Sequence, residues 1–178
     1  ALPISNSLHF YKDIHSQFVD TVFSKMENNS FLLGWGEDEY QTVYKASNYS
    51  ISVLPADYAY NLSFLTNFDI TLTQKNHEIE TQTIDEVHTV CFLMSDGDNI
   101  QWLLNWFITD ERWFGNNNRG QIDIGWTISP ALSELAPSAI NKIFETASNN
   151  ENGKDYFIAG PSGSGYIYSE SYSALVSY

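Results

Sequence analysis

The sequence predicts an α/β domain built on a mostly parallel sheet with flanking helices. Five short apolar segments, each bounded by Gly, Pro, Asn or Asp, are typical of strands, and helical patterns lie between them. These segments are apolar on both faces, which favours a parallel sheet with helices packed outside it. A complete (β/α)8 barrel needs roughly 250 residues, whereas this chain has 178. We therefore expect a single α/β domain over residues 1–178 that is part of, or similar to, a (β/α) barrel. If it is part of a complete barrel, the chain is a fragment of that larger barrel.

The first half of the chain predicts two helices and two strands. Apolar residues recur at every fourth position from Phe10 to Met26, as on one face of a helix that Ser5 or Ser7 would cap. Pro55 ends the second strand. The expected elements, in order, are a helix over 8–26, a strand over 31–35, a helix over 37–46 and a strand over 51–54.

The second half contains the strongest strand signal, an unbroken apolar run within residues 88–94. Cys91 lies inside this run, so we expect a buried and unreactive thiol. Pro137 fits only the first turn of a helix. Residues 66–86 are polar and predict no element. The other expected elements are a helix over 99–108, a strand over 122–128, a helix capped by Ser133 and a strand over 156–159.

The charge of the chain excludes several classes of partner. Lys and Arg total 8 against 22 Asp and Glu, which gives a net charge of −14. Nucleic acids and anionic membranes are repelled by such a field, and no run of 18 apolar residues predicts a helix that spans a bilayer. Aromatic residues make up 15% of the chain, enough to build a core and to leave rings for stacking on sugars.

Three N-x-S sequons begin at Asn28, Asn48 and Asn61. They predict a secreted or extracellular glycoprotein, because such sites receive glycans in the secretory pathway. The single cysteine cannot form an intrachain disulfide and therefore does not bear on the compartment.

Carboxylates follow three of the five expected strands. Glu37 and Asp38 come after the first strand, Asp57 after the second, and Asp96 and Asp98 after the third. Ligands of parallel α/β folds bind beyond the C-terminal ends of the strands, so we expect these five side chains to converge on one rim. In the plainer interpretation, Glu37 and Asp38 are the acidic first turn of a helix and Asp57 is an isolated turn residue.

Asp96 and Asp98 form the sharpest pair, because two nearby carboxylates separate their pKa values and so supply an acid and a base. Glycosidases use such a pair. Two alternatives stay open: one Asp caps the helix that starts near Asn99 while the other is solvated, or the carboxylates bind Ca²⁺ or Mg²⁺. The segment is not an EF-hand loop, because Ile100 and Gln101 occupy ligand and glycine positions.

Motifs for nucleotides, serine hydrolysis and zinc are incomplete. Gly160 and Gly165 have the spacing of a phosphate-binding loop, but Tyr166 stands where lysine is required. A nucleophile elbow at Ser162 lacks its last glycine, and His77 lacks the second histidine of a zinc protease. We therefore expect no cofactor and no metal.

Tryptophans divide into packing residues and candidate sugar platforms. Trp102 and Trp106 are four residues apart on an expected helix, which favours packing. Trp113 lies in a loop and Trp126 near a strand end, where an indole can stack on a sugar ring.

The segment Gly163-Ser164-Gly165-Tyr166-Ile167-Tyr168 resembles the signature of the GxGYxYP family, which is linked to glycoside hydrolysis. Residues 94–102, 125–130 and 160–162 are similar to the same family, and the likeness runs in order over roughly residues 31–170. Ser169 departs from the pattern, because it stands where the signature has Pro.

The resemblance implies a β/α barrel-like fold and sugar processing. Gly163 and Gly165 would allow a backbone path that a Cβ would block, while Tyr166 and Tyr168 would face a ligand or pack beneath the rim.

Three functions are compatible with these patterns. The first is a glycoside hydrolase in which Asp96 or Asp98 is the acid, Asp57, Glu37 or Asp38 the base or nucleophile, and Trp126, Tyr166 and Tyr168 hold the sugar. The second is a non-catalytic glycan-binding or structural secreted glycoprotein. The third is metal-dependent deacetylation of a carbohydrate, for which no histidine ligands are evident near the Asp pair.

Overall fold

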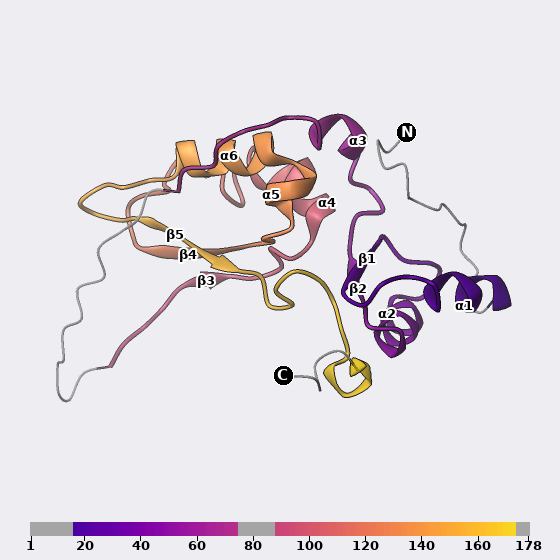
Figure 1. Ribbon diagram of the computed structural model, residues 1–178. Coiled ribbons are helices and arrows are strands. Elements are labelled where there is room, and N and C mark those ends of the chain that lie inside the picture. Colours follow the sequence, from indigo (N-terminus) through magenta and orange to yellow (C-terminus); the bar gives the residue numbers. More distant parts are fainter. Residues whose placement is uncertain (1–15, 75–87, 174–178) are drawn as a thin grey trace.

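The computed structural model of the chain describes residues 16–74 and 88–173 (Figure 1). The helices are α1 (Gln17–Phe23), α2 (Glu39–Asn48), α3 (Leu62–Leu65), α4 (Ile100–Trp102), α5 (Leu132–Leu135), α6 (Pro137–Thr146), the π-helix η1 (Leu103–Phe107) and the 3₁₀-helix η2 (Ser169–Ser171). The strands are β1 (Ser30–Leu33), β2 (Ile51–Leu54), β3 (Leu93–Met94), β4 (Ile124–Ile128) and β5 (Asp155–Ala159). The order β-α-β recurs along the chain, as the sequence predicts.

All five described strands pair in parallel, in two small sheets. β1 pairs with β2, and the order of the second sheet is β3-β4-β5. Within the described residues these sheets are open and do not close into a barrel. Helices α4, α5 and α6 cover one face of the three-stranded sheet (Figure 1), whereas Ile158 of β5 is 41% exposed. The expectation of a mixed α/β fold with a mostly parallel sheet is confirmed in this form.

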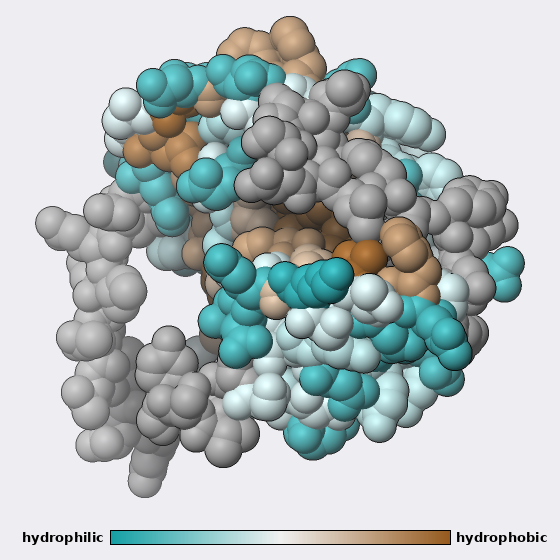
Figure 2. Space-filling model, turned by 45° about the vertical axis from the view of Figure 1, so that its right-hand side comes forward, coloured by the Kyte–Doolittle hydropathy of each residue, from teal (hydrophilic) through white to brown (hydrophobic). Residues whose placement is uncertain are grey.

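Two apolar clusters hold the elements in place. The larger cluster lies between β4 and the helices α4, η1, α5 and α6, and at its centre Phe107, Phe114 and Trp126 are buried with ring centroids 5.1 to 5.6 Å apart. The smaller cluster joins α1 and α2 to β1 and β2 through Phe23 and Val43. On one face of the molecule, Figure 2 shows an apolar recess between hydrophilic rims. Truncating a buried Phe of this kind costs about 3–5 kcal/mol.

Two expected elements of the second half differ from the structure. The strand expected over 88–94 is limited to Leu93–Met94, and Cys91 is exposed rather than buried. β3 is an edge strand that pairs on one side with β4, and this contact reaches back to Phe92, whose carbonyl accepts from Gly125 N over 2.9 Å. The helix expected over 99–108 changes from α-helix to π-helix at Leu103.

Helix boundaries follow local chemistry. Asp38 and Asn99 each accept a hydrogen bond from a backbone N–H in the first turn of α2 and α4. The expected helix near Ser133 is divided into α5 and α6, and Pro137 stands in the first turn of α6 as predicted. Ser16 caps α1, while the expected cap residues Ser5 and Ser7 lie outside the described residues.

Candidate functional site

The loops that follow β1, β2 and β3 meet at the C-terminal ends of the strands. The backbone N–H of Gly34, after β1, donates to the carbonyl of Leu54 over 2.8 Å. The backbone N–H of Gln101, after β3, donates to Pro55 O over 3.2 Å, and its side-chain Oε1 accepts from Tyr58 N over 2.7 Å. Distant parts of the sequence therefore share one rim, as parallel pairing predicts.

The turn after β3 is held tightly against β4. Asp96 is exposed and has a left-handed backbone with a φ of +69°. Gly97 is buried, and a Cβ placed on it would lie 1.6 Å from the carbonyl oxygen of Thr127, so the turn requires glycine. Thr127 Oγ1 accepts from Gly97 N over 2.9 Å and donates to Met94 O over 2.8 Å. This clamp sets where the Asp96 carboxylate lies.

Asp98 faces the loop after β5. Its side chain is 6% exposed, and Oδ2 accepts hydrogen bonds from Ser162 Oγ over 2.5 Å and from Ser162 N over 3.3 Å. Gly160 lies so close that an added Cβ would be 2.8 Å from the Asp98 Cβ. Asp98 therefore joins the turn after β3 to the loop that carries the Gly-rich segment.

Asp57 and Tyr166 lie against the residue after β1. Asp57 Oδ1 accepts from the backbone N–H of Trp35 over 3.1 Å. The rings of Trp35 and Tyr166 stack with centroids 6.1 Å apart. The backbone of Tyr166 pairs antiparallel with Val53, with N–H···O distances of 2.7 and 3.0 Å. The signature segment thus extends the edge of β2.

Tyr166 is in an environment that disfavours its ionised form. Burial, followed by the negative charges of Asp98, Glu39 and Asp96, raises the pKa of the Tyr166 phenol to about 12. The hydroxyl therefore stays protonated near neutral pH and can donate a hydrogen bond. Both carboxylates of the Asp96-Gly97-Asp98 turn contribute to this rise in the pKa.

Glu37 and Asp38 take positions that fit the plainer interpretation. Asp38 Oδ1 accepts from Gln41 N over 2.7 Å and caps α2. Glu37 is exposed in the loop before this helix. Asp38 is therefore occupied as a helix cap.

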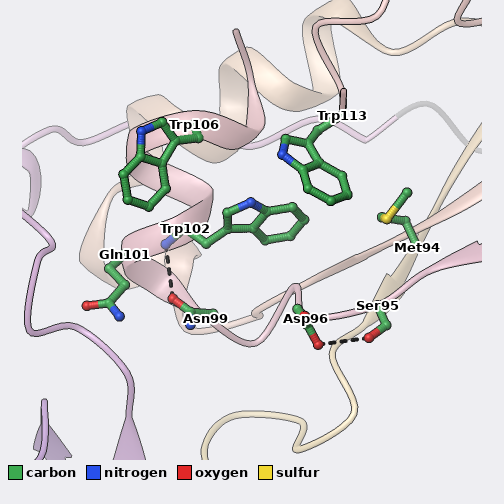
Figure 3. Close-up of a pocket in the computed structure, with 8 residues that line it drawn as sticks. All are labelled: Met94, Ser95, Asp96, Asn99, Gln101, Trp102, Trp106 and Trp113. Carbon is green, nitrogen blue, oxygen red and sulfur yellow. Dashed lines mark hydrogen bonds between the residues drawn. The ribbon is translucent and has the colours of Figure 1, made fainter. Parts of the chain in front are cut away.

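Beside the Asp96 turn is a hollow of about 360 Å³ that we call the Trp pocket (Figure 3). Figure 3 shows the indole of Trp102 between those of Trp106 and Trp113 on one side and Asp96 and Asn99 on the other. Trp102 and Trp113 meet edge to face, with ring centroids 5.3 Å apart. The lining residues are Met94, Ser95, Asp96, Asn99, Gln101, Trp102, Trp106 and Trp113.

The π-helix accounts for the position of Trp106. In a π-helical turn the hydrogen bond spans five residues, and Trp102 packs against Phe107, five residues on, with ring centroids 5.0 Å apart. Trp106 is 54% exposed, so the prediction that it packs inside the protein is wrong. Sequence reasoning therefore missed Trp102 and Trp106 as pocket residues, because their four-residue spacing signals ordinary helix packing.

Trp126 does not reach the pocket. It is 4% exposed in the larger core cluster, and its Nε1 donates to Asp155 Oδ1 over 2.7 Å. The prediction of Trp126 as a sugar platform is therefore wrong in this structure, because a strand-end indole here points into the core. Trp113, the other expected platform, lines the pocket.

Gly163, Gly165 and Tyr168 of the signature segment have structural surroundings rather than places in the Trp pocket. Gly163 has a φ of +60°. A Cβ on Gly165 would lie 3.0 Å from the Ser52 Cβ, which shows how closely the segment follows β2. Tyr168 packs against two tyrosines of α2 rather than lining the Trp pocket.

Within residues 16–74 and 88–173, no three His, Cys, Asp or Glu side chains gather closely enough to hold a metal ion. Of the four histidines, His88 is exposed, and His9, His15 and His77 lie outside the described residues. None of the helices in those two ranges has the length and apolarity needed to cross a membrane.

Two family matches cover most of the chain. Residues 86–178 match the "GxGYxYP putative glycoside hydrolase C-terminal domain". The chain belongs to the GxGYxYP family. Residues 4–67 match the "GxGYxYP third domain" of the same family. The two matches correspond to the two sheets, since β1 and β2 lie in the first range and β3, β4 and β5 in the second.

A solved structure resembles this GxGYxYP chain over most of its length. It is the crystal structure of "a putative hydrolase from Bacteroides thetaiotaomicron VPI-5482", 37% identical in sequence, with a TM-score of 0.72. The similarity covers 86% of this chain and 29% of that chain. The GxGYxYP chain therefore spans less than a third of this relative. No curated protein matches it.

Proposed function

We propose that the GxGYxYP chain carries a carbohydrate site at the C-terminal ends of its strands, and that the site serves to cleave a glycosidic bond. The observation that carries the proposal is the Trp pocket, in which three indoles and the exposed carboxylate of Asp96 share one hollow. Indoles cover the apolar face of a sugar ring, and the side chains of Asn99 and Gln101 supply groups for its hydroxyls. The family description supports the same class of substrate.

In the proposed reaction, Asp96 acts on the glycosidic oxygen from the Trp pocket, and the second carboxyl group comes from another acid at the strand ends, since Asp98 is buried and bound to Ser162. A carboxylic acid protonates the leaving oxygen as the C–O bond breaks, and a water molecule adds to the anomeric carbon after losing its proton to a carboxylate. Glycosidases place the two carboxyl groups about 5–5.5 Å apart for retention or about 6.5–9.5 Å apart for inversion.

One observation favours a second candidate, binding of a glycan without cleavage. The carboxylates of Asp38, Asp57 and Asp98 accept hydrogen bonds from donors of the protein itself. Asp96 also accepts one, from Ser95 Oγ over 2.8 Å (Figure 3). Among the expected catalytic carboxylates, Asp96 is the one that lines the Trp pocket. Recognition of a sugar by three indoles and one carboxylate needs no second acid.

The two candidates separate in one experiment on the full chain. Wild type, Asp96→Asn and Trp106→Ala are assayed for hydrolysis and for binding with the same set of neutral polysaccharides. For a hydrolase, Asp96→Asn lowers turnover at least about 100-fold, in line with the loss of a general acid or base, and leaves binding within about threefold. Trp106→Ala weakens binding in either case. Binding by the wild type without hydrolysis selects the second candidate, and unchanged binding by Trp106→Ala refutes the site.

Secretion, glycosylation and a barrel remain parts of the proposal. Asn28, Asn48 and Asn61 are exposed. A glycan on Asn28 or Asn61 would not displace the core, whereas Asn48 stays free of a glycan in this proposal because it lines a hollow beside α2. A protein that acts on polysaccharides meets them outside the cell. We further propose that the parallel strands belong to a larger barrel in a longer protein, since the chain spans 29% of its solved relative.

A further inference from the structure

A second hollow of about 490 Å³ lies against α2, which the smaller core cluster joins to α1. Tyr44 is part of its wall, and Tyr40 stacks on Tyr44 with ring centroids 6.1 Å apart and planes 9° apart. Tyr168 meets Tyr40 edge to face at 5.3 Å. We call this feature the α2 hollow. Its lining residues are Asp20, Gln41, Tyr44, Lys45, Asn48 and Tyr49.

The tyrosines beside the α2 hollow are exposed yet held in place. Tyr40 is 55% exposed and Tyr44 is 43% exposed, so two neighbouring rings face solvent. The backbone N–H of Tyr168 donates to Ser47 Oγ over 2.9 Å, and Ser47 is fully buried. This bond fixes the backbone of Tyr168, whose ring packs against Tyr40 and Tyr44. Rings held in this way lose little conformational freedom when a ligand stacks on them.

Polar groups in the α2 hollow combine donors and acceptors without net charge. Lys45 Nζ lies 2.9 Å from Asp20 Oδ1, and the hydroxyl of Tyr49 donates to the same oxygen over 3.0 Å. The hydrogen bonds from Lys45 and Tyr49 lower the pKa of Asp20, so this carboxyl group is ionised near neutral pH. Asn48 Nδ2 donates to Tyr44 O over 2.9 Å, which leaves its Oδ1 to accept a hydrogen bond from a ligand.

We propose that the α2 hollow is a second carbohydrate-binding site that takes a segment of a neutral polysaccharide. The tyrosine rings offer stacking surface to the apolar faces of sugar rings, while the Lys45–Asp20 pair and the amides of Gln41 and Asn48 meet hydroxyl groups. The net charge of −14 opposes an anionic ligand. Unlike the Trp pocket, this site is built from α2 and from Asp20, the residue of α1 that lines it, and carries no reaction.

The test measures retention of the full chain in native gels that contain xylan, galactomannan, mixed-linkage β-glucan or amylopectin. The protein is produced in a bacterial host, because a glycan on Asn48 would fill the same hollow. Tyr44→Ala is expected to weaken retention on the bound polysaccharide about tenfold, the value of one stacked ring, and Gln41→Ala about threefold. Tyr60→Ala is the matched control, since Tyr60 is 65% exposed and outside the hollow, and should change nothing.

Each outcome decides between the two sites. Weaker binding by Tyr44→Ala and Gln41→Ala, with thermal unfolding unchanged for at least one of them, supports the α2 hollow. If Trp106→Ala in the same gels binds as wild type does, the α2 hollow stands while the proposed Trp site fails. Retention that is lost in Trp106→Ala and kept in both α2 variants overturns the inference but not the proposed function. Absence of wild-type retention on all four polysaccharides overturns it as well.

Discussion

The contact between Asp98 and Ser162 gives a quantitative prediction about the turn that follows β3. The Ser162 hydroxyl donates to the carboxylate over 2.5 Å, and Asp98 is 6% exposed. A hydrogen bond to a charged group contributes about 1.5–3 kcal/mol, and the longer bond from Ser162 N, at 3.3 Å, adds less. Because Ser162 is half-buried, its freed donors reach water in part. We therefore expect Asp98→Ala to lower the free energy of unfolding by about 2–3 kcal/mol.

A double-mutant cycle isolates this contact. Unfolding in urea is followed for wild type, Asp98→Ala, Ser162→Ala and the double variant, and the coupling between the two changes should be about 1.5–2 kcal/mol. Asp96→Asn is the control, since Asp96 is exposed and Asn tolerates its left-handed backbone; its effect should stay within about 0.5 kcal/mol. A coupling below about 0.5 kcal/mol would show that Asp98 does not hold the loop after β5.

Two further predictions concern the core and the rim. Asp155 is fully buried and accepts hydrogen bonds from Trp126 Nε1, Ser148 N and Arg119. Asp155→Ala should therefore lower the free energy of unfolding in urea by about 3–5 kcal/mol. A loss under about 1 kcal/mol would contradict the assignment of this network. The pKa of the Tyr166 phenol is raised from its ordinary value of 10 to about 12 in the folded chain, so the folded state holds this proton more tightly than the unfolded state does. The contribution of this group to stability is therefore full below pH 10 and is lost as the pH rises from 10 to 12. Phenolate absorbance compared between wild type and Tyr166→Phe should show the missing group ionising with a midpoint near pH 12, and a difference centred near pH 10 would refute the burial argument.

The parallel arrangement of the strands could be predicted from the sequence because it depends on local patterns. Unbroken apolar segments such as Ile51–Leu54 mark strands with two covered faces, and the loop contacts at Pro55 and Gln101 confirm that the strand ends meet. The run over 88–94 has the same composition but lies at an edge. Whether a partner strand covers such a run is decided by distant parts of the chain, which a local pattern does not contain.

The position of the candidate site at the strand ends could be predicted from the sequence, but the positions of its tryptophan side chains could not. Asp96 lies at the pocket that the strand ends form, as expected, whereas Trp126 and Trp106 exchange their expected roles. Trp126 is drawn inward by the buried acceptor Asp155, 29 residues away. Trp106 points outward in a π-helix, and no residue type in this segment predicts that wider helical turn. Both effects depend on tertiary contacts.

The path of residues 160–168 has a mechanical consequence. This one stretch of peptide begins beside β5, touches Asp98 through Ser162, and ends paired with β2 through Tyr166. It therefore joins the two sheets, next to the direct contact of Gln101 N with Pro55 O. The signature motif therefore connects the two halves of the chain, and a displacement of one sheet relative to the other would strain this segment.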